Sequence, residues 1–104
     1  MRIQPRMVVI VPCDSEETRK ATVAAAFNGS PTYIRFGREK SPVFTTKDTP
    51  FEIGKAEVLR EGRDVVIVGC GMLLYDAVGA AEELAKEQID CMVINSHTIK
   101  PMDE

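Results

Sequence analysis

The sequence predicts an α/β fold in which two β-α-β units form a mainly parallel sheet of about four to five strands with two main helices. Short runs of β-branched residues carry this prediction, because they are typical of strands buried on both faces of a parallel sheet. These runs are "MVVIVP" (Met7–Pro12), "VVIVG" (Val65–Gly69) and "CMVIN" (Cys91–Asn95). Two segments with helix signals separate the strand-like runs, so right-handed crossovers are expected.

The first β-α-β unit covers residues 1–38. After its first strand, a helix is predicted over residues 14–29, because Asp14 and Glu17 have the spacing of a capping box. The run "TYIRF" (Thr32–Phe36) predicts the second strand. The glutamates of both predicted helices are expected to face solvent. Paired-carboxylate chemistry needs acids that converge away from water, so these residues do not indicate it. They are Glu16, Glu17, Glu82, Glu83 and Glu87.

Residues 39–54 are rich in proline, glycine and threonine and are expected to be a linker, with at most a short strand at Val43–Thr45. The second unit covers residues 55–104. The alternating segment Lys55–Glu61 predicts a half-exposed strand, and residues 72–87 have apolar side chains at helical spacing. Two helices cannot cover both faces of such a sheet. We therefore expect one compact domain with an apolar face or edge, completed by self-association, most simply as a dimer.

Length and charge narrow the functional classes. The chain has 104 residues, with 13 Lys and Arg against 16 Asp and Glu and a net charge of -3. This balance argues against a nucleic-acid or anionic-membrane partner. The N-terminal apolar run is too short for a signal peptide, so we expect a cytoplasmic protein. Three cysteines without a CxxC pair predict neither a closed disulfide framework nor a metal site.

Three motifs, "PTYIRFGR", "IGKAEVLREG" and "TIKPMD", occur in the order and at the spacing found in transketolases. The chain resembles most closely the carboxy-terminal subunit of the split, two-subunit form. Residues 1–38 are similar to the end of the pyrimidine-binding domain, and residues 55–104 to the start of the carboxy-terminal domain. The resemblance implies ketol-group transfer between sugar phosphates, thiamine diphosphate and magnesium as cofactors, and an amino-terminal subunit as partner.

The same resemblance implies that the chain does not act alone. It lacks the GDG…N motif with which the family holds magnesium and diphosphate. The family's activating glutamate and substrate histidines lie upstream of the matched stretch, so no cofactor is expected in the isolated chain. One site residue carries over: Arg38, in "FGRE", matches the arginine that binds the phosphate end of the sugar substrate. The alternative is a surface Arg38 paired with Glu39.

A second interpretation needs no cofactor. The turn Gly69-Cys70-Gly71 leads from a strand into a helix and is a candidate anion-binding site. Cys13 and Cys70 precede helices, where thiolates are favoured, and His97 follows a strand at the same expected edge. These three are weak catalytic candidates. The alternative function is therefore a small standalone oligomeric module that binds an anionic metabolite or has weak hydrolase activity.

Overall fold

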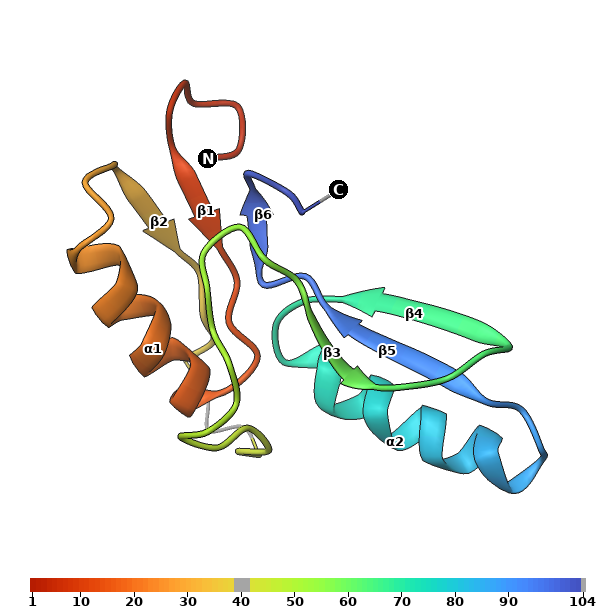
Figure 1. Ribbon diagram of the computed structural model, residues 1–104. Helices are drawn as coiled ribbons and strands as arrows, with labels where there is room; N and C mark the ends of the chain where they lie inside the picture. Colours follow the sequence, from red (N-terminus) through yellow and green to blue (C-terminus); the bar gives the residue numbers. More distant parts are fainter. Residues whose placement is uncertain (39–41, 104) are drawn as a thin grey trace.

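The computed structural model describes residues 1–38 and 42–103, which form two helices and two small sheets of three strands each (Figure 1). No helix among these residues is long and apolar enough to cross a bilayer. In chain order, the elements are β1 (Val8–Ile10), α1 (Ser15–Ala26), β2 (Thr32–Ile34), β3 (Glu57–Arg60), β4 (Val65–Gly69), α2 (Leu73–Lys86), β5 (Cys91–Asn95) and β6 (Thr98–Lys100).

The first sheet has the strand order β2-β1-β6. Strands β1 and β2 are parallel, as predicted for the first β-α-β unit, and α1 connects them. Strand β6 pairs antiparallel with β1, with a register shift between Val9 and Ile10. The sequence analysis did not predict β6, because three residues carry little periodicity and their partner strand lies about ninety residues away in the chain.

The second sheet has the order β3-β5-β4 and is covered on one face by α2 (Figure 1). Strands β4 and β5 are parallel, whereas β3 pairs antiparallel with β5. A buried apolar cluster lies between this sheet, α2 and the start of α1, and consists of Cys13, Leu74, Ala81, Cys91 and Val93. In the first unit, Val9, Ile10 and Ala21 are also buried.

The α/β class, the two helices and the two parallel β-α-β pairs are confirmed, but the expected single sheet is wrong. Six strands form two mixed sheets, because β6 and β3 each add an antiparallel partner to a parallel pair. The short strand considered at Val43–Thr45 does not form. Its backbone instead donates hydrogen bonds to a side chain of the first unit.

Strand β4 is not buried on both faces, contrary to the sequence prediction. The side chains of Val66 and Val68 are 56% and 61% exposed. The register places them beside Met92 and Ile94 of β5, on the face opposite to α2. Ile67, on the other face, packs against the core. The expected apolar surface is therefore this uncovered sheet face, which no described helix covers.

Candidate functional site

The ends of the strands from both sheets meet where the sequence analysis expected a common rim. Beyond β1, the backbone N–H of Val11 donates to the carbonyl of His97 at 2.7 Å. Beyond β5, the N–H of Ser96 donates to the carbonyl of Gly69 at 2.8 Å. The chain segments that follow β1, β4 and β5 are thereby joined at one place. Cys70 is half-buried there, whereas Cys13 and His97 are fully buried.

Arg38 is exposed, and the residue before it lies against the start of α2. The preceding residue, Gly37, approaches Met72 so closely that a Cβ at Gly37 would lie 2.7 Å from the Met72 Cε atom. Met72 is the N-cap of α2, and its side chain makes no capping hydrogen bond. The glycine thus permits the contact that brings the Arg38 segment against α2. Glu39, the alternative partner of Arg38, lies outside the described residues.

A pocket of about 440 Å³ opens between the end of β2 and the start of α2. A second arginine, Arg35, lines it together with Cys70 and Gly71 of the predicted anion-binding turn. Gly71 in this turn has φ +72, a conformation that favours glycine. The full lining consists of Val11, Pro12, Arg35, Phe36, Gly37, Cys70, Gly71, Met72 and Leu73.

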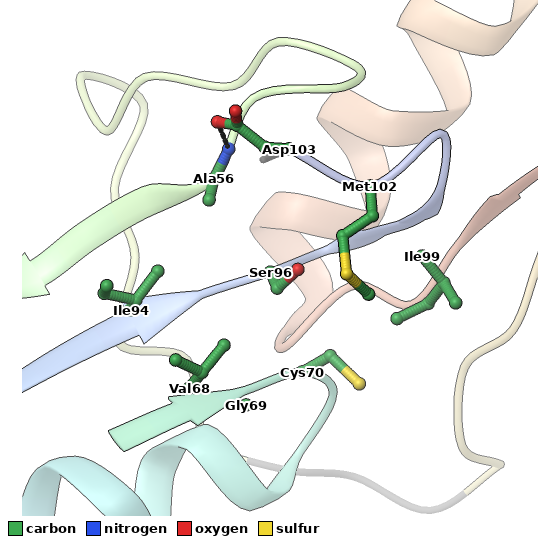
Figure 2. A pocket seen from close by; sticks show the side chains of 9 residues that line it. All are labelled: Ala56, Val68, Gly69, Cys70, Ile94, Ser96, Ile99, Met102 and Asp103. Carbon is green, nitrogen blue, oxygen red and sulfur yellow. Dashed lines mark hydrogen bonds between the residues drawn. The ribbon is translucent and has the colours of Figure 1, made fainter. Parts of the chain in front are cut away.

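A second pocket, of about 460 Å³, lies between the two sheets on the uncovered side (Figure 2). Cys70 lines both pockets. The walls of the second pocket are mostly aliphatic, with Val68 and Ile94 from the sheet and Met102 from the chain end. The Asp103 carboxylate accepts a hydrogen bond of 2.8 Å from the backbone N–H of Ala56, which holds the chain end over β3. This pocket continues the apolar sheet face, and its described lining residues offer an anion no cationic side chain.

Glu17 is buried, which contradicts the expectation that it faces solvent. Its side chain is 2% exposed. One carboxylate oxygen accepts from the backbone N–H of Cys13 at 3.0 Å, and the other accepts from Nδ2 of Asn95 at 2.7 Å. Asn95 closes β5 and is fully buried, so this pair joins the first turn of α1 to the second sheet. The other four glutamates are not buried.

Asp14 caps α1 and also binds the backbone at Phe44 and Thr45. Its side chain accepts from the N–H of Glu17 at 2.8 Å, as the capping-box spacing predicted. It further accepts from the backbone N–H groups of Phe44 and Thr45 and from the Thr45 hydroxyl. Burial raises the pKa of Asp14, but the hydrogen bonds from Glu17, Thr45 and Phe44 outweigh burial and lower the pKa overall.

The buried Cys13 thiol and the His97 imidazole share no hydrogen bond among the described residues. Burial, and next the nearby charge of Glu17, raise the pKa of the Cys13 thiol, so the expected thiolate is wrong for Cys13. Burial also lowers the pKa of His97. Nδ1 of His97 shares a hydrogen bond of 2.9 Å with the Thr98 hydroxyl, and its ring stacks on Phe51. The Nε2 atom of His97 is buried and has no hydrogen-bond partner among the described residues, so a catalytic role of His97 stays a prediction.

Sequence reasoning missed Glu17 and Asn95 as one buried pair. Each was a common pattern: an acid in the first turn of a helix and a polar residue at a strand end. The available signal was their combination, since an asparagine at the end of a buried strand needs a partner at the same rim.

Comparison with known proteins adds direct evidence on the family to which the chain belongs. A family model described as "Transketolase, C-terminal domain" matches residues 54–104. Over 104 residues, the chain is 41% identical to a 6-deoxy-6-sulfo-D-fructose transketolase subunit of Clostridium sp. (strain MSTE9). That match covers 100% of this chain and 32% of the relative. A solved split-gene transketolase, described as an inactive beta4 tetramer, superimposes with a TM-score of 0.94 at 41% identity.

The chain belongs to the transketolase family. It corresponds to the carboxy-terminal section of the split-subunit type, and it spans about a third of the curated split subunits that it matches. One of these, an apulose-4-phosphate transketolase subunit of Phocaeicola vulgatus, is 35% identical, with 99% of this chain and 33% of the relative covered. The split-gene structure covers 99% of this chain, which in turn covers 34% of that protein. The fold is shared with a transketolase variant of Pichia stipitis, which superimposes with a TM-score of 0.75 at 22% identity. That match covers 94% of this chain and 15% of the Pichia protein.

The described residues do not provide the metal-binding end of a transketolase cofactor site. Magnesium-bound diphosphate needs several oxygen ligands at one place. Within residues 1–38 and 42–103, no group of three or more His, Cys, Asp or Glu side chains is placed to hold a metal ion. The buried carboxylates Asp14 and Glu17 are already occupied by backbone and side-chain donors. This part of the chain therefore does not fit the metal-diphosphate end of the cofactor.

Proposed function

We propose that this transketolase-family chain contributes the phosphate end of a sugar-phosphate site and takes part in ketol-group transfer only with other transketolase parts. The supporting observation is the contact between Gly37 and Met72, one residue before Arg38, at the N-cap of α2, whose side chain makes no capping bond. An arginine is a good bidentate partner for phosphate, and free N–H groups at a helix start favour an anion.

The turn Gly69-Cys70-Gly71 is the second half of this proposed site. Cys70 and Gly71 line the same pocket as Arg35, next to the start of α2. The start of α1 is a weaker anion site, because Asp14 and Glu17 accept from the N–H groups around it. Cys70 is in this proposal a lining residue of the turn.

In this proposal, the cofactors and the substrate-binding histidines belong to the transketolase parts upstream of the matched stretch or to an amino-terminal subunit. The bare face of the second sheet, with Val66, Val68 and Ile94, supports further association between copies of this chain, as a dimer. Three free cysteines suit a reducing, cytoplasmic location. Sedimentation at tens of micromolar should give a mass above that of a monomer, and Val68→Glu should lower it. A wild-type monomer would contradict the dimer.

The phosphate site is tested by titrating fructose 6-phosphate into ¹⁵N-labelled chain and following amide shifts. We expect shifts around Gly37 and Gly69–Met72, and a binding about tenfold to hundredfold weaker for Arg38→Ala, the loss typical of a charge-assisted hydrogen bond. Arg63→Ala is the matched control, because it removes the same charge at the opposite end of β4. Shifts centred on Asp90–Cys91, or equal affinities of Arg38→Ala and wild type, would contradict the site.

The transferase role is tested by reconstitution. The chain is mixed with the amino-terminal subunit of a split transketolase, thiamine diphosphate and magnesium, and both the mass of the complex and ketol transfer are measured. A complex containing both chains is expected. Failure of the two to associate at tens of micromolar, with the amino-terminal subunit active in the presence of its own partner, would contradict the role.

A further inference from the structure

We propose that two copies of this chain pair through strand β4, whose free edge joins antiparallel to the same strand of the second copy. The two sheets β3-β5-β4 then form one continuous sheet of six strands, three from each copy. This inference rests on the self-association proposed above and names the surface and the hydrogen bonds that produce it.

Strand β4 lacks the features with which proteins keep the edges of their sheets unpaired. Among the described strands, the other three edges have such features. Strands β2 and β6 have three residues each, and β6 pairs with β1 through a register shift. Strand β3 has a register shift beside β5 and carries the charged residues Glu57 and Arg60. Strand β4 runs for five residues in unbroken register with β5 and contains neither a charge nor a proline. Such an edge is a template for pairing with another strand.

Alternate residues of β4 point their backbone groups away from β5. The N–H of Val65 donates to the carbonyl of the residue before β5, and the carbonyl of Gly69 accepts from the N–H of the residue after β5. In a parallel ladder, residues that bond to one neighbouring strand alternate with residues that face the other side. The N–H and C=O groups of Val66 and Val68 therefore face the free edge of the sheet (Figure 1). Strand β4 thus offers two donors and two acceptors to another strand.

A twofold axis at Ile67 uses all four of these groups at once. Such an axis relates the two β4 strands antiparallel, as strands in a symmetric dimer must run. With Ile67 opposite its own copy, Val66 lies opposite Val68 of the second copy. Both residues of this pair have outward N–H and C=O groups, so they exchange two hydrogen bonds. Symmetry repeats the pair, and four bonds join the strands over their full length.

The same register suits the side chains and the charges. Val66 and Val68 are more than half exposed and lie on the sheet face that α2 leaves uncovered. Opposite residues of an antiparallel pair have their side chains side by side on one face, so each valine gains an apolar neighbour. The charged residues before β4, Arg63 and Asp64, come opposite the uncharged turn that follows β4 in the second copy. Like charges therefore stay apart, and the edge of β4 is complementary to itself.

Sedimentation of the full chain and two variants measures the strength of this pairing. Val68→Pro removes an N–H that faces the edge and leaves the bonds between β4 and β5 in place, since proline is tolerated on an edge strand when its nitrogen faces outward. It should weaken dimerisation about tenfold to hundredfold, because two of the four bonds are lost. Val68→Ile is the matched control. It keeps the N–H and an apolar β-branched side chain, so its dissociation constant should match that of wild type.

A second measurement uses the wild type and needs no substitution. Labelled (¹³C) and unlabelled chains are mixed, and an isotope-filtered NMR experiment records contacts between copies. Ile67 faces its own copy as a pair without hydrogen bonds, and such pairs bring the two Cα atoms within about 4.5 Å. A contact between the Hα atoms of the two Ile67 residues is therefore expected. This contact decides the question alone if Val68→Pro does not fold, which circular dichroism checks.

The possible results separate this inference from the proposed dimer. A wild-type monomer at tens of micromolar overturns both. A wild-type dimer without the Ile67 contact, or one that Val68→Pro leaves equally strong, overturns the edge pairing alone and leaves another surface as the dimer interface. If the amides of Val66 and Val68 become protected from hydrogen exchange only when the amino-terminal subunit of a split transketolase is added, the edge belongs to that subunit and the self-pairing is wrong.

Discussion

Removing the carboxylate of Glu17 tests whether the buried pair with Asn95 stabilises the fold. In Glu17→Ala, the N–H of Cys13 and the Nδ2 group of Asn95 both lose their acceptor inside the protein. Neither donor regains a partner in water, since Cys13 and Asn95 are 1% and 0% exposed. The substitution therefore leaves two buried donors unsatisfied, which is costlier than removing both halves of a hydrogen bond.

The magnitude follows from these two bonds. A hydrogen bond to a charged group contributes about 1.5–3 kcal/mol, so Glu17→Ala should lower the free energy of unfolding by about 3–6 kcal/mol. Glu17→Gln should cost far less, about 1 kcal/mol. The reason is that Oδ1 of Asn95 has no partner among the described residues. A rotated Asn95 amide can present this oxygen to the side-chain nitrogen of the introduced glutamine, whose own oxygen then accepts from Cys13.

Urea unfolding followed by circular dichroism, with linear extrapolation to water, measures both variants. Glu16→Ala is the control, because Glu16 lies in the same turn and its ion pair is with the exposed Arg19; its unfolding midpoint should match that of wild type. Two results would refute the reasoning. One is a Glu17→Ala loss below about 1 kcal/mol, which would mean that the carboxylate does not offset its own desolvation. The other is a Gln variant as unstable as the Ala variant.

Burial and the missing cofactor motif lead to three more predictions. Burial lowers the pKa of His97. The contribution of this buried imidazole to stability is therefore complete above the unfolded pKa of about 6.5 and is lost as the pH falls below that value. The decrease in the free energy of unfolding between pH 7.5 and pH 5.5 should be smaller in His97→Gln than in wild type. Under native conditions, iodoacetamide should label Cys70 well before Cys13 and Cys91, which are buried, and mass spectrometry showing equal rates would contradict this. Calorimetry should detect no micromolar, magnesium-dependent binding of thiamine diphosphate to the isolated chain, and such binding would overturn the assignment of the cofactor to other transketolase parts.

The parts of the fold that the sequence predicts best are those with local signals. The run "VVIVG" is a strand because β-branched residues favour it, and Asp14 begins α1 because its side chain accepts from an N–H three residues on. The division into two sheets has no such signal. It depends on which strand takes the antiparallel place beside β1 and beside β5, and that pairing is decided by distant parts of the chain. The exposure of Val66 and Val68 has the same origin, since a strand run does not show which of its faces a helix covers.

The candidate site divides in the same way. Arg38 and the turn Gly69-Cys70-Gly71 come from resemblance and from their place at strand ends and stay predictions, whereas the burial of Glu17 had no signal in the sequence. A glutamate in a first turn is ordinarily exposed, and only the approach of Asn95 from β5 makes its burial favourable.

Buried polar contacts at the strand ends explain why the two sheets meet in one arrangement. Among the described residues, the two sheets share no paired strand. Apolar contacts tolerate sliding, but a buried hydrogen bond fails when its partners shift by more than about 1 Å. The polar links that cross from the first unit to the rest of the chain include Glu17 to Asn95, Asp14 to Thr45, and Val11 to the carbonyl of His97. Asn95 lies opposite Gly69 of the turn Gly69-Cys70-Gly71 in the register of β5 and β4, and Val11 lines the pocket at the start of α2. We therefore expect variants at Glu17 to disturb the proposed phosphate site before they disturb the apolar core around Leu74.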